Sequence, residues 1–223
     1  MKIGTLTIGQ SPRVDIIPEL KEAIGFEVKI EERGALDNLT LEEVKDLYPK
    51  PHDYILVTRM RDGKEVKIAE KHIIKRMKKC IADLEKEEVD FVILLCTGEF
   101  PNITSKKLIL KPDRLLENII RGIFQEGVMA VVVPSPDQIP LMEKKWERTN
   151  MEIIVESVSP YTGTEEEIEK VAKKIGKTDV DLVVLDCLGF GREVKTIFRK
   201  ITKKPVLLPR TLLGRVAGEL IER

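Results

Sequence analysis

The stretch DFVILLCTG, Asp90–Gly98, decides the fold, because it joins the features of a buried strand to a cysteine and a glycine at its end. Its apolar run lacks the alternation of a half-exposed strand, which is typical of a parallel strand covered on both faces. A second stretch, DLVVLDCLG at Asp181–Gly189, has Asp, Val, Leu, Cys and Gly at the same places.

The similarity extends to the residues before each strand. KEEVDFVILLCTG from Lys86 and KTDVDLVVLDCLG from Lys177 align at a constant offset of 187 − 96 = 91 residues. The two stretches share a helix end, a strand and a turn in the same register, which indicates an internal duplication. The duplication predicts two α/β lobes, each with one cysteine at the carboxyl end of a strand. In open α/β sheets, ligands bind at this end.

Apolar runs alternate with helical patterns along nearly the whole chain. Strands are predicted at residues 2–8, 27–33, 54–60, 91–96, 129–134, 152–157, 182–187 and 205–209. Helices are predicted at residues 15–24, 67–87, 112–125, 138–148, 164–175, 193–201 and 211–222. This alternation predicts an α/β fold of two pseudo-symmetric, Rossmann-like lobes with parallel-sheet cores.

Helix starts and turns carry local signals. Ser11 before Pro12 is typical of an N-cap followed by a first helical residue. Thr164 with Glu167 has the spacing of a capping box. The segment Met60–Val66 contains Asp-Gly between extended residues and predicts a hairpin or a loop tip.

The charge balance excludes some partners. The chain of 223 residues has 38 Lys and Arg against 38 Asp and Glu, without long blocks of like charge. We therefore expect neither a nucleic-acid nor a membrane partner. The opening KIGTLTIG is too short and strand-like for a signal peptide, and no apolar run approaches the roughly 18 residues of a spanning helix. A cytoplasmic location is expected.

The sequence lacks the motifs of common cofactors. Three cysteines without a C-x-x-C spacing predict no disulfide framework or zinc site, and His52 and His72 lack the spacing of metal ligands. The GFG at Gly189–Gly191 resembles a dinucleotide motif, but Val194 stands where the third glycine is needed. We expect no cofactor and no metal.

Cys96 and Cys187 are the candidate catalytic residues. Each ends a predicted strand and precedes a turn glycine, Gly98 or Gly189, where backbone N–H groups and a helix amino terminus would stabilise a thiolate. A single buried cysteine is often only core, but two at equivalent places of a repeat favour a pair facing across an interlobe cleft. One thiol would remove a proton next to a carboxylate and the other would deliver one from the opposite side.

The third cysteine, Cys80, has a different pattern. It belongs to one face of a predicted helix together with Ile73, Met77, Ile81 and Leu84, which predicts a core position.

The loop after the first strand, Ile8–Glu19, is the candidate anion site. Gln10, Ser11 and Arg13 bring an amide, a hydroxyl and a guanidinium to a strand's carboxyl end. The arginine fork suits a substrate carboxylate. A plain helix start is the alternative interpretation of the same residues.

Weaker candidates follow other strands. Thr58, Arg59, Ser135 and Tyr161 each stand where a predicted strand would meet the cleft, although polar residues there are usually turn formers. Glu99 and Asp186, beside the cysteine turns, could tune the pKa of a thiol or serve as capping or solvated carboxylates.

Four stretches resemble AroM family proteins along almost the whole chain: TIGQSPRVDIIPE, LLCTGEFP, LDCLGFG and PVLLPRTLLGRVAGELI. That family is similar to the aspartate/glutamate racemase superfamily, in which two pseudo-symmetric lobes each supply a cysteine to an active site without a cofactor. By this resemblance Cys96 and Cys187 are the catalytic thiols, and Thr97 contacts a substrate carboxylate. Residues 98 and 189 complete the cysteine turns as substrate-binding candidates.

The resemblance also implies a domain organisation. Residues 1–111 and 205–223 would form a discontinuous first lobe and residues 112–204 the second, because the last strand and helix return to the first lobe from Pro205. A homodimer is implied in the same way. Racemases of that superfamily commonly have Cys-Asn-Thr and Cys-Thr-His, whereas this chain has Cys-Thr-Gly from Cys96 and Cys-Leu-Gly from Cys187.

The leading hypothesis is a cofactor-independent racemase, isomerase or lyase acting next to a carboxylate of a small acid. The alternative is a non-catalytic protein of the same fold that binds or senses a small anionic metabolite through Gln10, Ser11 and Arg13. A dithiol redox switch is a third hypothesis, and it requires Cα atoms about 4.4–6.8 Å apart.

Overall fold

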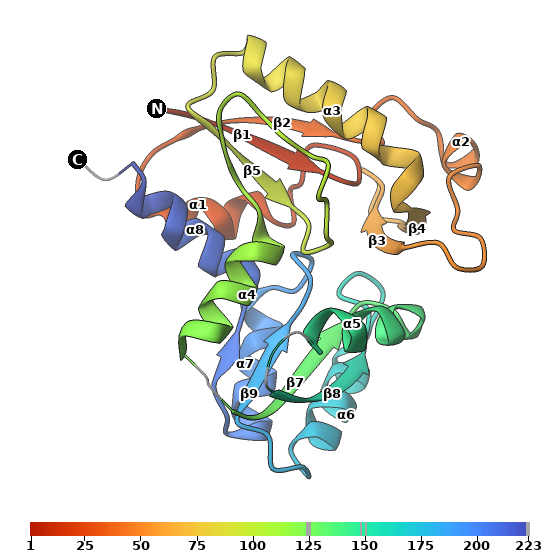
Figure 1. Ribbon diagram of the computed structural model, residues 1–223, viewed down its shortest axis with the longest axis vertical. Coiled ribbons are helices and arrows are strands. Elements are labelled where there is room, and N and C mark those ends of the chain that lie inside the picture. Colours follow the sequence, from red (N-terminus) through yellow and green to blue (C-terminus); the bar gives the residue numbers. More distant parts are fainter. Residues whose placement is uncertain (124–125, 148, 150, 222–223) are drawn as a thin grey trace. The chain divides into compact units, whose positions relative to one another are not determined.

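The computed structural model describes residues 1–123, 126–147, 149 and 151–221. The chain divides into two compact units, Met1–Asp113 with Leu213–Arg223, and Arg114–Leu212 (Figure 1). Within the described residues, none of the helices has the length and apolar character needed to cross a membrane.

The first unit is built on a four-stranded parallel sheet in the order β2-β1-β5-β6. Its strands are β1 (Lys2–Thr7), β2 (Lys29–Gly34), β5 (Phe91–Leu95) and β6 (Leu108–Leu110). Thr7 at the end of β1 is in register with Gly34 and with Leu95. The loops after β1, β2 and β5 therefore leave the same edge of the sheet.

The second unit repeats this arrangement. Its parallel sheet has the order β8-β7-β9-β10. The strands are β7 (Gly127–Val133), β8 (Met151–Ser157), β9 (Leu182–Leu185) and β10 (Val206–Leu207). Each strand has its counterpart at the same place in the first sheet, so the predicted α/β fold with two parallel sheets is confirmed.

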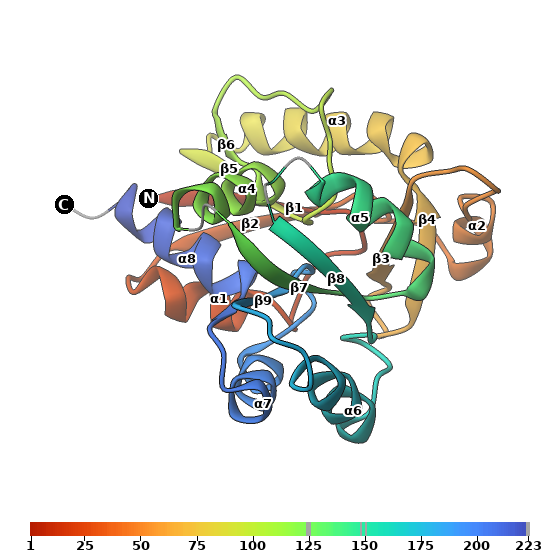
Figure 2. The ribbon, with the colours of Figure 1, turned by 60° about the horizontal axis from the view of Figure 1, so that its bottom comes forward.

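Residues of β7 alternate between two cores. Ala130 and Val132 pack with residues of α6 (Glu165–Ile175) and α7 (Arg192–Thr202). Met129, Val131 and Val133 pack on the opposite face, with residues of α4 (Pro112–Ile123) and α5 (Ile139–Trp146). Figure 2 shows α6 and α7 together on one side of β7 and β9. Both faces of the sheet are covered, which explains the continuous apolar runs.

The segment predicted as a strand at 54–60 lies outside the parallel sheets. It forms β3 (Ile55–Arg59), which pairs antiparallel with β4 (Glu65–Ala69) in a separate two-stranded sheet. The predicted hairpin around Asp62 and Gly63 is thereby confirmed. Because β4 continues to Ala69, the helix predicted from Lys67 begins three residues later, as α3 (Glu70–Lys86).

The start of the first helix also differs from the prediction. α1 (Ile17–Ile24) begins with Pro18 in its first turn, so Ser11 is not its N-cap. Ser11 instead donates its hydroxyl to Asp37 Oδ2 at 2.6 Å. The capping box of Thr164 and Glu167 at the start of α6 is confirmed.

Three further elements were not predicted: β6, the 3-10 helix η1 (Pro136–Gln138) and the five-residue α2 (Leu41–Lys45). Of these, α2 has a clear sequence signal, because Thr40 and Glu43 form a capping box at its start. The predicted helix ends at Gln125, Arg148 and Glu222 lie outside the described residues.

The helix that follows the last strand of each sheet belongs, over most of its length, to the other unit. α4 follows β6, yet its Leu116 and Ile120 pack in the second unit's core. α8 (Pro209–Glu219) follows β10, yet from Leu213 onward it belongs to the first unit, where Gly214 lies against Leu20 and Ala23 of α1.

The duplication extends into these two helices. In the first sheet Ile109 is in register with Val92, and in the second sheet Val206 is in register with Val183, the counterpart of Val92. Ile109 and Val206 are therefore counterparts, at an offset of 206 − 109 = 97 residues. At this offset PDRLL from Pro112 aligns with PRTLL from Pro209.

The predicted boundaries need a correction. A return of the chain to the first lobe was expected at Pro205, but β10 pairs with β9, with Val206 opposite Val183. The last strand therefore belongs to the second sheet. The divisions between the two units fall later, after Asp113 and after Leu212.

Candidate active site

Cys96 lies one residue beyond the end of β5, in the first unit. Its Sγ accepts a hydrogen bond from the backbone N–H of Gly98 at 3.4 Å. A Cβ on Gly98 would approach Leu56 Cδ2 to 2.8 Å, so the turn packs closely against β3. The chain then continues through a loop into β6 rather than into a helix, contrary to the prediction.

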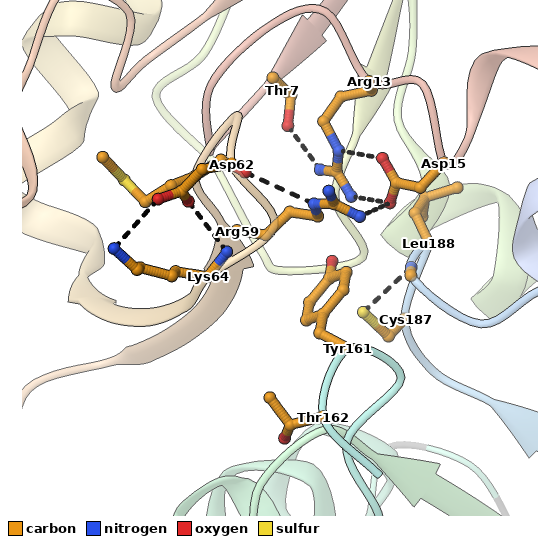
Figure 3. Close-up of polar contacts among 12 residues, drawn as sticks. Thr7, Arg13, Asp15, Arg59, Asp62, Lys64, Tyr161, Thr162, Cys187 and Leu188 are labelled. Carbon is orange, nitrogen blue, oxygen red and sulfur yellow. Dashed lines mark hydrogen bonds and ion pairs between the residues drawn. The ribbon is translucent and has the colours of Figure 1, made fainter. Parts of the chain in front are cut away.

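Cys187 has the same local geometry in the second unit. Its Sγ accepts a hydrogen bond from the backbone N–H of Gly189 at 3.3 Å (Figure 3). A Cβ on Gly189 would come within 2.7 Å of Pro160 and of the Tyr161 ring, so the loop after β8 packs against the turn. Here a helix does follow, because α7 starts at Arg192.

These two turns share one chemical arrangement. In each, the cysteine sulfur receives the N–H of the glycine two residues further along the chain. A hydrogen bond donated to sulfur favours the charged thiolate over the neutral thiol. The local geometry at both positions is therefore suited to a reactive thiol.

Cys80 differs in environment from the other two thiols. It packs on α3 against the core of the first unit, as its helical spacing predicts. Burial, assisted by the charge of Asp37, raises the pKa of Cys80 to about 11. This thiol stays neutral at pH 7.

The side chain of Gln10 binds within its own unit. Its amide nitrogen donates to the carbonyl oxygens of Leu36 and Leu39, at 3.2 and 2.8 Å. Its amide oxygen accepts from the backbone N–H of Arg61 at 2.8 Å. Gln10 thus ties the loop after β1 to the loop after β2 and to the β3–β4 hairpin.

Asp37 holds Ser11 in the same loop. Its carboxylate accepts from the backbone N–H and the hydroxyl of Ser11 and from the backbone N–H of Gly34. A Cβ on Gly34 would come within 2.7 Å of the Ser11 nitrogen, so only glycine leaves room for this approach.

Arg13 is buried and its guanidinium fork holds a carboxylate of the chain. Nε and Nη2 donate to the two oxygens of Asp15 at 2.9 and 2.7 Å, and Nη1 donates to the Thr7 hydroxyl at 2.9 Å (Figure 3). Burial acts to raise the pKa of Asp15, but the hydrogen bonds and charge of Arg13, with the charge of Arg59, hold it below its usual value.

The structure brings Arg59 to the same cluster, with Nη1 3.9 Å from Asp15 Oδ2. The side chain of Arg59 is 21% exposed, against 2% for Arg13. Of the two guanidinium groups, that of Arg59 is therefore the more exposed to solvent. Thr58, the residue before it, is buried with its hydroxyl against Gly9, and that oxygen has no hydrogen-bond partner in the described part of the chain.

Ser135 acts as a turn former. Its hydroxyl accepts from the backbone N–H of Asp137 and caps η1. Thr97, between Cys96 and Gly98, is buried.

A buried ion pair stands directly before Cys187. Lys145 Nζ on α5 donates to Asp186 Oδ2 at 2.8 Å, and the two side chains are 6% and 0% exposed. The same oxygen accepts from Trp146 Nε1 at 3.2 Å, and Lys145 Nζ lies 4.8 Å from the centre of the Trp146 ring. In the first unit the equivalent position is the apolar Leu95.

Arg210 was not among the residues predicted from the sequence. It lies in the first turn of α8 and is 3% exposed. Its Nε donates to Leu188 O at 3.0 Å and its Nη2 to Gly189 O at 2.8 Å. The sequence signal for it is its place in PVLLPRTLLGRVAGELI, one of the four stretches that resemble the AroM family.

In the described ranges, no cluster of three or more His, Cys, Asp or Glu side chains is arranged to hold a metal ion.

Solved structures with similar folds cover nearly the whole chain. The aspartate racemase of Picrophilus torridus is 12% identical with a TM-score of 0.58, covering 99% of this chain and 94% of its own. The maleate isomerase Iso of Pseudomonas putida S16 is 12% identical with a TM-score of 0.61, covering 96% and 90%. Unliganded arylmalonate decarboxylase is 10% identical with a TM-score of 0.62, covering 99% and 91%.

The chain therefore has the α/β fold shared by these racemases, isomerases and decarboxylase. It belongs to the AroM family, because the model of that family, described as AroM protein, matches residues 3–221. A comparison with curated proteins finds no match.

Proposed function

We propose that this protein is a cofactor-independent racemase, isomerase or lyase acting on the carbon next to a carboxylate of a small acid. Cys96 and Cys187 serve one site and act on opposite faces of that carbon. One observation carries the proposal: duplicated strands end in cysteines that receive the same N–H···S hydrogen bond. The fold, shared with racemases, isomerases and a decarboxylase, supports this class of reaction.

For racemisation, the proposed chemistry needs only proton transfer. The thiolate of one cysteine takes the α-proton, so that a C–H bond breaks and an S–H bond forms. The thiol of the other cysteine then gives its proton to the opposite face of the resulting enolate. No electrons are gained or lost. After turnover the first cysteine releases its proton to water and the second takes one from water, which restores the starting state.

Arg59 is the proposed contact for the substrate carboxylate. Its guanidinium is partly exposed and stands beside Asp15, whereas the fork of Arg13 already holds Asp15. Arg13 would then act through Asp15, which fixes the position of Arg59. The backbone N–H groups of the cysteine turns would supply further donors to the developing negative charge.

Deuterium exchange tests this proposal. The protein is incubated in D₂O with small mono- and dicarboxylic acids that carry a hydrogen on the α-carbon, and deuterium at that carbon is followed by NMR together with product formation. Cys96→Ala and Cys187→Ala should each abolish net turnover, while Cys80→Ala, the matched control, should retain it.

Two results would contradict the proposal. One is turnover that survives the loss of either Cys96 or Cys187. The other is a complete absence of exchange together with tight binding of an acid that both replacements leave unchanged, which would support the non-catalytic sensor instead.

A further inference from the structure

Arg210 makes a specific contact with the turn that carries Cys187. Its Nε donates to the carbonyl oxygen of Leu188, and its Nη2 donates to that of Gly189. A guanidinium remains charged at every physiological pH. A buried cation therefore stands on the carbonyl side of the turn.

The first of these contacts reaches the sulfur through one peptide group. The carbonyl of Leu188 and the N–H of Gly189 belong to the same peptide, and this N–H donates to Cys187 Sγ. The order is thus guanidinium, carbonyl, N–H, sulfur. Hydrogen bonds in such a chain polarise one another by about 10–30% per bond. The guanidinium also fixes the orientation in which the N–H points at sulfur.

The first unit has a different residue at this place. At the offset of 97 residues, the counterpart of Arg210 is Asp113. A carboxylate accepts hydrogen bonds and cannot donate one to a carbonyl oxygen. The duplicated thiols thus share the N–H···S hydrogen bond, but the residue that follows the last strand of the sheet is Arg210 in the second unit and Asp113 in the first.

Three other polar or charged side chains lie near the Cys187 turn: Asp186, Tyr161 and Glu193. Asp186 directly precedes Cys187 and would disfavour a thiolate, but it is paired with Lys145 Nζ at 2.8 Å. Tyr161 packs its phenol ring against Gly189, and Glu193 of α7 folds back against Gly191. The Asp186 and Lys145 charges offset each other, and the guanidinium of Arg210 is in direct contact with the turn.

We propose that Arg210 is a positioning residue that makes Cys187 the thiolate, and hence the base of the reaction, while Cys96 remains the protonated acid. The assignment of base and acid rests on the proposed function. The difference in acidity between the two thiols does not, because it is argued from the contacts of Arg210 and not from a reaction.

The test is the pH dependence of alkylation at each thiol separately. Cys80→Ala with Cys96→Ala leaves Cys187 as the single thiol, and Cys80→Ala with Cys187→Ala leaves Cys96. Rates with iodoacetamide are measured across pH. We expect the midpoint for Cys187 to lie about one pH unit or more below that for Cys96. Arg210→Met should raise the Cys187 midpoint, Arg210→Lys should restore it in part, and neither should move the Cys96 midpoint.

A purely structural role would change the urea midpoint of unfolding without moving the alkylation midpoint. Equal midpoints for the two thiols, or a Cys187 midpoint unmoved by both replacements, would overturn the proposal. If Arg210→Met fails to fold, the comparison of Cys187 with Cys96 and the Arg210→Lys variant decide alone. Alkylation needs no substrate, so this result is independent of deuterium exchange.

Discussion

At the scale of single residues, Cys80 places its sulfur 3.5 Å from the carbonyl oxygen of Gly34 and keeps its proton. Burial raises its pKa from 9.0 to about 11. The unfolded chain therefore loses this proton first as the pH rises, and stability should fall between about pH 9 and about pH 11. Cys80→Ala should reduce that loss.

Urea unfolding of the wild type and of Cys80→Ala at about pH 8 and about pH 10.5 measures this loss of stability. Cys80→Val, which fills more of the space, serves as a second variant. An equal loss of stability in the wild type and both variants between the two pH values would contradict the expectation.

Asp15 gives the opposite pH dependence, because its pKa is lowered in the folded state by Arg13 and Arg59 against the effect of burial. Its contribution is present above the usual carboxyl pKa of about 4 and is lost as the pH falls through the lowered value. Asp15→Asn should destabilise the protein at pH 7 by about 2 kcal/mol, because the buried Arg13 loses a charged partner. It should also reduce the fall in the free energy of unfolding as the pH is lowered into the acid range.

The control is Asp179→Asn, at a fully exposed carboxylate whose contact is a surface pair with Lys204. It should leave the free energy of unfolding nearly unchanged. Equal losses in the two variants at pH 7 would show that the Arg13 pair adds nothing.

At this scale the sequence identifies the groups but not their partners. The repeat singles out Cys96 and Cys187, and the structure adds their matching N–H···S bonds. Arg13 was predicted as a free fork for a ligand, and that role stays a prediction. Asp15, two residues away, fills the fork here, which the sequence alone does not reveal because neighbouring charges are as often solvated.

At the scale of elements, α5 and β9 are joined by the buried pair of Lys145 and Asp186. Lys145→Met leaves a buried carboxylate without its cation and should cost about 3–5 kcal/mol. Lys145→Met with Asp186→Leu should recover most of that loss, because Leu95 occupies the equivalent position in the first unit. The freed Trp146 N–H limits the recovery.

A double-mutant cycle by urea unfolding measures the coupling, with Asp186→Leu as the other single variant. If the double variant is less stable than Lys145→Met alone, the pair is not the source of the effect.

The elements were predictable where local chemistry decides them. The capping box starts α6, and Asp62-Gly63 closes the β3–β4 hairpin. The parallel placement of residues 54–60 was wrong, because a short apolar run does not specify its partner strand. Ser11 failed as an N-cap because α1 begins six residues later, at Ile17, and the Ser11 hydroxyl donates to Asp37 instead.

At the scale of the whole molecule, the duplicated strand order was predictable from the two cysteine stretches. The exchange of α4 and α8 between the units was expected only from the family resemblance, which placed residues from 112 in the second lobe and the last helix in the first. Leu116 and Ile120 give α4 an apolar face, but such a face does not say which sheet it covers. The end of the second unit was expected at 204 rather than after Leu212, because the short run of β10 does not specify its partner strand, and β10 was assigned to the first lobe although it pairs with β9.

The central claim is that Cys96 and Cys187 serve one site, and a bifunctional thiol reagent tests it without knowledge of the substrate. Cys80→Ala protein is treated with dibromobimane, which becomes fluorescent when it bridges two thiols, and the digested product is analysed by mass spectrometry. We predict one bimane per chain, linking the peptide of Cys96 to the peptide of Cys187. Two thiols that each carry their own reagent, with no bridged peptide, would contradict the account.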